Sequence, residues 1–260
     1  MIAKHALASG DYVVATSRSV EGLTEALVGA GEGETSDRLL VLALDVTDAV
    51  AALRASDAAV KQFGRIDVLV NNAGRAQLGW FETVTEADVR RQFEINLFGA
   101  MNVARAVLPQ MRVQRAGMLV TVSSVNGLVS NPGGSVYSAS KFALEGWMEG
   151  LAEEIAPLGI RSLIVEPGMM RTNFLDPSTA RQGDIDIEDY AEAVGGFRAF
   201  IAEANGNQQN DPEDLARLIV SEVSSESPTA RLLFGPDAHL WAADKSRRLL
   251  KEIEESAARN

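Results

Sequence analysis

The chain alternates short, continuous apolar runs with longer segments in which apolar residues recur every three to four positions. Continuous apolar runs are typical of strands buried on both faces, and the recurring pattern is typical of helices with one apolar face. Strands are expected at 12–16, 39–44, 66–70, 118–122, 161–165 and 231–234. Helices are expected at 1–9, 21–27, 48–63, 85–103, 138–156, 187–204, 212–223 and 241–253.

This alternation indicates an α/β fold with a parallel sheet that carries helices on both faces. The pattern predicts a doubly wound sheet of the Rossmann type. The 260 residues are expected to form one such domain, 1–260, and the polar, glycine-containing segment 173–210 is expected to bind the substrate. The glycine-rich stretch 29–33 precedes a strand and contains an acidic residue, so it is expected to be a loop.

Composition excludes several classes of function. The net charge of −12 argues against binding to nucleic acid or to an anionic membrane surface. There are no cysteines, and the histidines are only His5 and His239, so a thiolate site, a metal site and a Ser-His-Asp triad are poorly supported. No apolar run approaches the roughly 20 residues that span a bilayer, and the start does not resemble a signal peptide. A cytoplasmic protein is therefore expected.

Tyr137 and Lys141 are four residues apart in a predicted helix, so both side chains project from one face. A phenol with a pKa of about 10 is a poor acid or base at neutral pH. An ammonium group one helical turn away is expected to lower that pKa and to make the phenol a tunable proton donor and acceptor.

Further motifs follow the predicted strands. Ser124 ends one apolar run, the sequence Asn71-Asn72-Ala73-Gly74 follows another, and Pro167-Gly168 and Thr172 follow a third. Together with Tyr137 and Lys141, these residues resemble the short-chain dehydrogenase/reductase family. The resemblance extends from about residue 4 to about residue 175.

The resemblance implies a catalytic role for four residues. Tyr137 would be the general acid for carbonyl reduction and the base for alcohol oxidation, and Lys141 would lower its pKa and contact the nicotinamide ribose. Ser124 would hydrogen-bond the substrate oxygen, with Ser123 as the neighbouring alternative. Asn96 matches the helix asparagine that holds a proton-relay water in the family. No metal ion is needed for this chemistry.

The resemblance also implies a nicotinamide dinucleotide cofactor. Ser17 occupies the position where an acidic residue would favour NAD, and the adjacent Arg18 can clamp a 2′-phosphate, so NADP is favoured over NAD. Two positions have alternatives, because Asp45 could cap the next helix and Thr172 could be a helix N-cap. Besides Arg18, the resemblance implies that the following residues bind the cofactor: Asp45, Val46, Asn71, Ala73, Gly74, Tyr137, Lys141, Pro167, Gly168 and Thr172.

The sequence departs from the family at its start. Members open with a strand and a glycine-rich turn before the first helix, whereas Met1 stands where the body of that helix should already be running. The expected sheet therefore lacks its first strand and has a gap between the strands at 12–16 and 66–70. Either the true start lies upstream, which we favour because the later sites are retained, or the polypeptide begins here and is impaired.

Two functional hypotheses follow. The first is an NADP-dependent oxidoreductase that interconverts a small-molecule carbonyl compound and an alcohol. The second is a truncated, catalytically silent or regulatory relative with impaired dinucleotide binding. The family often assembles through the helices at 86–112 and 138–156, so a homodimer or homotetramer is expected.

Overall fold

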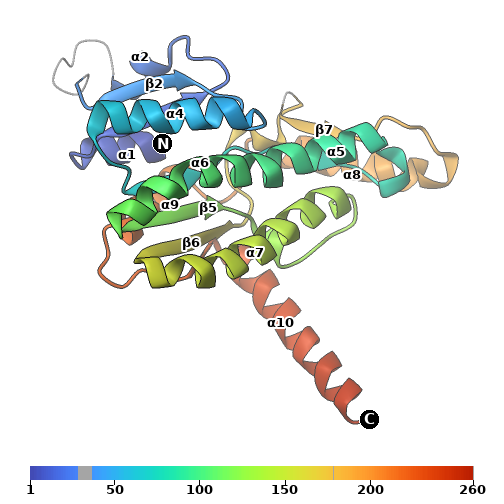
Figure 1. Ribbon diagram of the computed structural model, residues 1–260. Coiled ribbons are helices and arrows are strands. Elements are labelled where there is room, and N and C mark those ends of the chain that lie inside the picture. Colours follow the sequence, from blue (N-terminus) through green and yellow to red (C-terminus); the bar gives the residue numbers. More distant parts are fainter. Residues whose placement is uncertain (29–36, 178, 260) are drawn as a thin grey trace.

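The strands form two parallel ladders and a smaller third pair. The computed structural model describes residues 1–28, 37–177 and 179–259, and the loop expected at 29–33 lies outside them. β1 pairs with β2, the second ladder has the order β3-β5-β6-β8, and β4 pairs with β7 (Figure 1). The strands are β1 (Val13–Ser17), β2 (Leu39–Ala43), β3 (Val68–Asn71), β4 (Ala76–Leu78), β5 (Gly117–Val122), β6 (Ile160–Pro167), β7 (Ala180–Gln182) and β8 (Arg231–Phe234).

Helices separate most of these strands. They are α1 (Ile2–Ala8), α2 (Leu23–Val28), α4 (Ala49–Phe63), α5 (Glu86–Phe93), α6 (Gly99–Gln114), α7 (Ser135–Ile155), α8 (Ala191–Ala204), α9 (Pro212–Val223) and α10 (Pro236–Ala257). Short helical turns are η1 (Phe81–Thr83), η2 (Glu94–Phe98), η3 (Val125–Gly127), η4 (Ala156–Leu158), η5 (Asn173–Leu175) and η6 (Glu188–Tyr190). The α/β fold class predicted from the apolar pattern is confirmed.

Both faces of the four-stranded ladder are covered, because neighbouring residues of a strand point to opposite sides. On one face, Leu119 of β5 packs with Val107 of α6 and Met148 of α7. On the other face, Val120 packs with Leu215 of α9. This two-sided burial explains why the strands are continuous apolar runs in the sequence.

The two main ladders do not join. In the described part of the chain, β1 and β3 pair only with β2 and β5, respectively, so the gap expected between these strands is found. Helix packing links the two ladders instead, since α1 contacts α9 and α4 contacts α6. The unit built on β1 and β2 is therefore held mainly by side-chain contacts.

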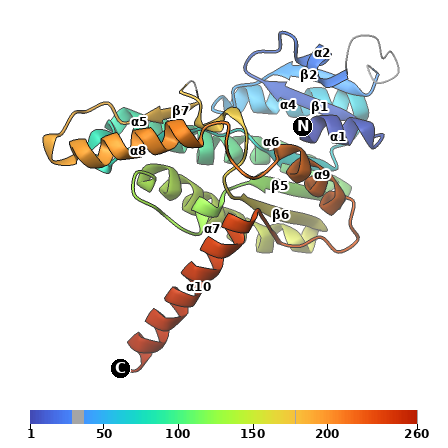
Figure 2. The same ribbon diagram turned by 180° about the vertical axis from the view of Figure 1, so that it is seen from behind.

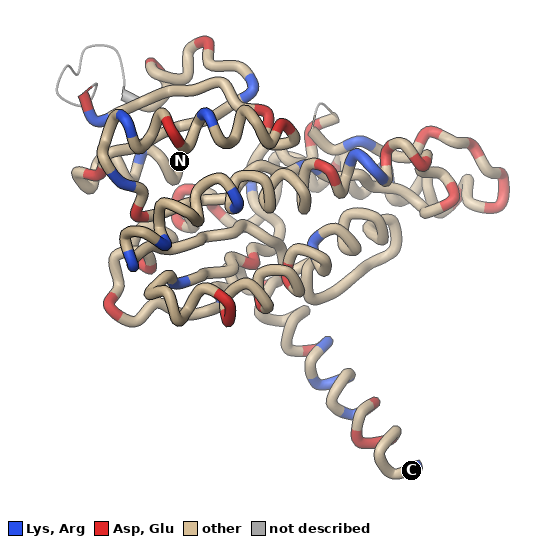
Figure 3. The backbone as a smooth tube through the Cα atoms, viewed as in Figure 1, with Lys and Arg blue, Asp and Glu red and all other residues tan. Residues whose placement is uncertain are grey.

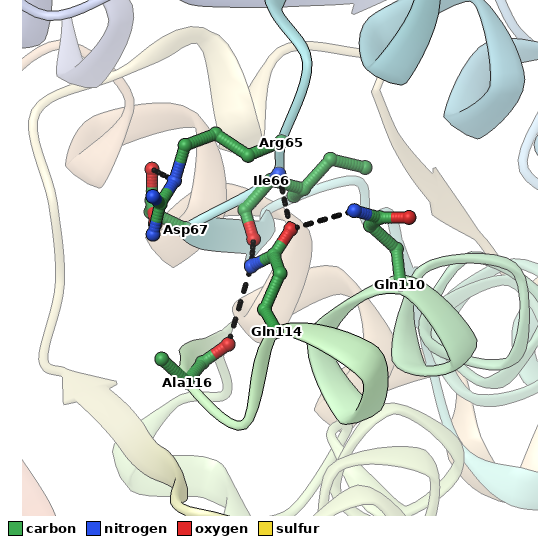
Figure 4. A network of polar contacts seen from close by, with 6 residues as sticks. All are labelled: Arg65, Ile66, Asp67, Gln110, Gln114 and Ala116. Carbon is green, nitrogen blue, oxygen red and sulfur yellow. Dashed lines mark hydrogen bonds and ion pairs between the residues drawn. The ribbon is translucent and has the colours of Figure 1, made fainter.

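The end of α6 is tied to the start of the four-stranded ladder. The Gln114 amide accepts a hydrogen bond from the backbone N–H of Ile66 (3.0 Å) and donates to the carbonyl oxygen of Ile66 (2.8 Å). Gln110 donates to the same amide, and Arg65 pairs with Asp67 beside it (Figure 4). These contacts fix the segment before the amino end of β3. The motif that begins at Asn71 lies at the opposite, carboxyl end of this strand.

The last helix departs from the body. α10 projects away from the sheets in both views, with its first turn beside the carboxyl ends of β6 and β8 (Figures 1 and 2). The sequence pattern predicted a helix at 241–253, and the observed helix begins five residues earlier at Pro236. Proline is favoured in the first helical turn, where no N–H is needed.

Candidate active site

The hydroxyl, phenol and ammonium groups singled out in the sequence converge at the carboxyl edge of the four-stranded ladder. Ser124 follows β5, and Tyr137 and Lys141 lie one turn apart on α7. All three are buried, with exposed fractions of 7%, 8% and 5%. Lys141 Nζ lies 6.0 Å from the centre of the Tyr137 ring.

The expected lowering of the Tyr137 pKa is not found. Burial raises the pKa of Tyr137 to about 12, although a hydrogen bond with the Ser124 side chain acts in the opposite direction. Lys141 Nζ instead donates a hydrogen bond to the carbonyl oxygen of Val122 at 2.9 Å. Burial lowers the pKa of Lys141 to about 8, opposed by the negative charge of Glu145. Tyr137 is therefore a protonated phenol at neutral pH.

Ser124, rather than Ser123, faces Tyr137. Ser124 Oγ accepts a hydrogen bond from the backbone N–H of Asn126 (3.1 Å), and Asn126 Nδ2 donates to Ser138 on α7 (3.2 Å). Ser123 Oγ is buried without a hydrogen-bond partner among the described residues. Ser123 Oγ and Glu145 Oε1 both lie close to Gly127, where an added Cβ would be 2.8 Å from each of them.

Asn96 is fully buried in the π-helical turn η2, between α5 and α6. Its side chain accepts from the backbone N–H of Arg75 (2.9 Å) and donates to the carbonyl oxygen of Arg75 (3.0 Å). Gln92, one turn earlier, donates to that carbonyl oxygen as well, and both amides donate to Ser140 Oγ. These side chains clamp the loop after β3 to α7.

Gln92 and Ser140 were not singled out in the sequence. Gln92 is fully buried, and its Oε1 also accepts from the backbone N–H of Gln77 (2.8 Å). Two amide side chains four residues apart, Gln92 and Asn96, on a helix with apolar neighbours are the signal that could have indicated this clamp.

The motif after β3 lies beside the catalytic candidates. Asn71 is buried, while Ala73 and Gly74 are exposed. A Cβ on Gly74 would lie 3.6 Å from Asn96 Oδ1 and 3.9 Å from Lys141 Nζ. The backbone at Gly74 is therefore open toward the lysine.

Four arginines gather near this loop: Arg18, Arg75, Arg91 and Arg181. Burial lowers the pKa of the Arg75 guanidinium, and the positive charges of Arg91, Arg181 and Arg18 act in the same direction, with Asp88 opposing them. Gln77, two residues after Arg75, pairs in register with Arg181 in the β4–β7 ladder. Within the described ranges, Arg18, Arg91 and Arg181 have no carboxylate partner in an ion pair. The cluster is thus a cationic region in an acidic protein, with Asp45 and Asp88 as nearby carboxylates.

Asp45 and Val46 lie between this cluster and α6. Asp45 Oδ1 accepts from the backbone N–H and the hydroxyl of Thr47, and these bonds lower its pKa. Asp48, not Asp45, caps α4, so the alternative role considered for Asp45 is not found. Val46 packs against the first turn of α6, where a Cβ on Gly99 would lie 2.5 Å from its Cγ2.

The loop after β6 carries Pro167, Gly168 and Thr172. The carbonyl oxygen of Pro167 accepts from Ser124 Oγ at 3.5 Å, and Gly168 donates its N–H to Phe234. Thr172 accepts from the backbone N–H of Phe174 and caps η5, so the alternative considered for Thr172 is found, on a three-residue helical turn.

Part of the segment 173–210 covers Tyr137. The Phe174 ring lies 5.7 Å from the Tyr137 ring, centre to centre, at 58°. Tyr137 belongs to an apolar cluster with Leu78 and Ile201, against which Leu175 and Phe197 pack. A separate hollow of about 440 Å³, lined by residues including Thr83, Ile187 and Arg198, does not include the catalytic candidates.

A group of charged side chains centres on Arg231, in which Glu145 and Glu166 are buried and Glu149 is exposed. Arg231 pairs with Glu145 (2.7 Å), with Glu149 and with Glu166. Burial and the nearby charge of Glu145 raise the pKa of Glu166 to about 7, with Arg231 opposing. No sequence motif pointed to this group.

The part of the chain that the structure describes holds neither a candidate metal cluster nor a membrane-spanning helix. No group of three or more His, Cys, Asp or Glu side chains is arranged to hold a metal ion there. None of the helices in that part combines the length and apolar character that crossing a bilayer requires.

The sequence profile of the short chain dehydrogenase family matches residues 1–183. Oxidoreductase BOA17 of Botryotinia fuckeliana is 37% identical over 254 residues, which cover 98% of this chain and 90% of that protein. A short-chain dehydrogenase from Streptomyces avermitilis has a TM-score of 0.85 and 40% identity, covering 99% of this chain and 93% of that one. A metagenomic short-chain oxidoreductase solved in complex with NADP has a TM-score of 0.67 and 26% identity, covering 90% of this chain and 89% of that one. With a matched profile over most of its length, relatives of this similarity and a shared fold, this chain belongs to the short-chain dehydrogenase/reductase family and is an oxidoreductase of that family.

Proposed function

We propose that this protein is an NADP-dependent oxidoreductase that reduces a carbonyl compound to an alcohol, with Tyr137 as the general acid. The observation that carries the proposal is the convergence of Ser124, Tyr137 and Lys141 at one edge of the sheet. When bound, the nicotinamide supplies the hydride.

The protein's own groups would handle the substrate oxygen and the proton. Tyr137 would donate its phenolic proton to the carbonyl oxygen, and the Ser124 hydroxyl would hold that oxygen by a hydrogen bond. Lys141, held by Val122, would stabilise the phenolate left behind. A Tyr137 pKa of about 12 keeps the proton on the phenol at neutral pH, so the proton that carbonyl reduction consumes is present.

The residues present fit a phosphorylated dinucleotide. The unpaired arginines Arg18 and Arg91 lie near Asp45, whose pKa their charges help to lower. Arg18 would bind the 2′-phosphate, Asp45 and Val46 would contact the adenine, and Gly74 would allow close backbone approach. Asn71 and Ala73 would line the adenosine side, and Pro167, Gly168 and Thr172 would lie on the nicotinamide side.

The surroundings of Tyr137 support a substrate with an apolar group next to its carbonyl. Phe174, Leu175 and Ile201 contribute apolar surface to the same cluster as the phenol. Segment 173–210 would then select the substrate.

Two substitutions test the proposal. Tyr137→Phe removes only the hydroxyl, so we expect turnover to fall by at least about 100-fold while NADPH binding, measured by calorimetry, stays unchanged. Tyr12→Phe changes an exposed tyrosine and is the matched control. Retained turnover in Tyr137→Phe would reject the assigned acid.

For the cofactor, Arg18→Asp should weaken NADPH far more than NADH, because the aspartate repels the 2′-phosphate and accepts from a 2′-hydroxyl. Arg161→Asp, at the amino end of β6, is the control. An unchanged NADPH/NADH ratio would remove the NADP assignment. Failure of the unsubstituted chain to bind either dinucleotide would favour the catalytically silent alternative.

A further inference from the structure

α10 is anchored to the body at its base. Ala238 and Ala242 are buried, and Ala238 packs with Val125 and Val129 beside the active site. Asp237 accepts a hydrogen bond from the backbone N–H of Met169 (2.7 Å), which fixes the first turn. The helix then continues to Ala257 away from the body (Figures 1 and 2).

The projecting part has an apolar stripe. Its members recur every three to four residues and therefore share one side of the helix. They are Leu249, Leu250, Ile253 and Ala257, in line with the buried Ala242 and with the polar Ser246. Leu249, Leu250 and Ile253 are 46%, 57% and 56% exposed. Because an isolated helix of this length is only marginally stable in water, an exposed stripe of this kind indicates a packing partner.

The charges on α10 differ between the outer face and the edge of the stripe. On the outer face, Asp244 pairs with Arg247 and Lys251 with Glu255 within the helix. Lys245 and Glu252, seven residues apart, lie along one edge of the stripe. Among the described residues, neither is in an ion pair.

The order of these charges along the helix is also uneven. In the projecting part, the half nearer the body carries Lys245, Arg247 and Arg248 with one acidic residue, Asp244, whereas the far half carries Glu252, Glu254 and Glu255 with one basic residue, Lys251 (Figure 3). A copy of the same helix running in the opposite direction presents acidic residues to the basic part and basic residues to the acidic part. A parallel copy brings like charges together.

We propose that α10 is a self-association surface, on which α10 of a second copy packs in antiparallel orientation. Leu249, Leu250 and Ile253 form the centre of the contact, and Lys245 of one copy lies opposite Glu252 of the other. The two bodies then lie at opposite ends of the helix pair. A lipid surface fits less well, because the polar side of the helix carries acidic as well as basic residues.

Sedimentation velocity tests this surface. Leu250→Glu should halve the oligomer's mass, with the circular dichroism spectrum and melting temperature of the body unchanged. Leu53→Glu places the same charge at a comparably exposed leucine on α4 and should leave the mass as in the unsubstituted protein. An unsubstituted protein that stays monomeric, or a mass that Leu250→Glu does not change, overturns the proposal.

Charge exchange tests the orientation. Lys245→Glu and Glu252→Lys should each raise the dissociation constant about tenfold, because each change affects two symmetric contacts. The double variant should restore the original constant. In a parallel pair equivalent positions lie at the same level, so the single variants would not show this tenfold loss, and its absence would reject the antiparallel orientation. Binding of monomeric protein to phosphatidylcholine/phosphatidylserine vesicles, lost in Leu250→Glu, would overturn the proposal in favour of a lipid surface.

Discussion

Lys141 Nζ donates a 2.9 Å hydrogen bond to the carbonyl oxygen of Val122, the last residue of β5. The ammonium group is thereby fixed to the strand end that leads into Ser124. The same contact holds the ammonium group near the Tyr137 ring, 6.0 Å from the ring centre. The relative positions of acid, cation and hydroxyl thus depend on one helix and one strand end.

The charge of Lys141 should control the alkaline limit of activity. Its pKa is lowered to about 8, so the ammonium loses its proton as the pH rises through that value. Because the proposed phenolate needs this positive charge, kcat/KM for carbonyl reduction should fall above about pH 8. A pH–rate profile measures this. Lys141→Arg retains the positive charge, so the remaining activity of this variant should not fall near pH 8. A fall that persists in the variant would show that another group titrates.

Glu166 should make stability depend on pH in the opposite sense to an ordinary paired carboxylate. Its pKa rises from 4.5 to about 7 on folding, so between these values the folded protein holds a proton that the unfolded chain has released. The free energy of unfolding therefore falls as the pH rises through this window. In Glu166→Gln, this fall should be smaller by on the order of 1 kcal/mol, measured by urea denaturation across the window. Glu153→Gln, an exposed change on α7, should leave the dependence as it is.

Asn96 should matter for the stability of the fold, independently of the catalytic role proposed for it. Its amide bonds both backbone groups of Arg75, so Asn96→Ala leaves the Arg75 N–H without this partner, while Gln92 still donates to the Arg75 carbonyl oxygen. We expect a loss of about 1–3 kcal/mol in the free energy of unfolding. Asn207→Ala removes a bond to the carbonyl oxygen of Glu203 on the surface and should cost less than about 0.5 kcal/mol. Equal losses in the two variants would contradict the clamp.

Two glycines near α7 should respond to alanine in opposite directions. In Gly127→Ala the new methyl group would lie 2.8 Å from Glu145 Cγ and from Ser123 Oγ, so overpacking should cost about 1–3 kcal/mol. Gly146 lies inside α7 with no atom within 4 Å of an added Cβ. Gly146→Ala should therefore stabilise the protein by about 0.5–1 kcal/mol. Thermal denaturation of both variants measures the contrast, and destabilisation by Gly146→Ala would show that its surroundings are occupied.

Most of the fold follows from local pattern. The helix expected at 212–223 and the strand expected at 231–234 have the observed bounds, because Pro212 marks a helix start and the strand is a continuous apolar run. β4 and β7 were missed, since three-residue strands show no period and form only when the chain brings them together. The spacing of Tyr137 and Lys141 was readable, whereas the direction of the Tyr137 pKa was not, because burial and the Val122 contact are tertiary effects.

One arginine of the cationic cluster could be identified from the sequence, and the other three could not. Arg18 was singled out from its place after a strand, but Arg75, Arg91 and Arg181 come from three other parts of the chain, and only folding reveals the cluster. The same holds for Arg231, which is distant in sequence from Glu145 and Glu166. The cofactor-binding roles of Arg18 and of the other residues implied by the family resemblance stay predictions.

The interruption between β1 and β3 has a mechanical consequence. Arg18 and Asp45 follow strands on one side of the break, and Tyr137 and Lys141 lie on the other. A dinucleotide bound by residues on both sides of this break would connect the two ladders, which share no backbone hydrogen bonds between β1 and β3. Loading the protein would then link its amino-terminal unit to the four-stranded ladder, and heat resistance would rise with occupancy of the site.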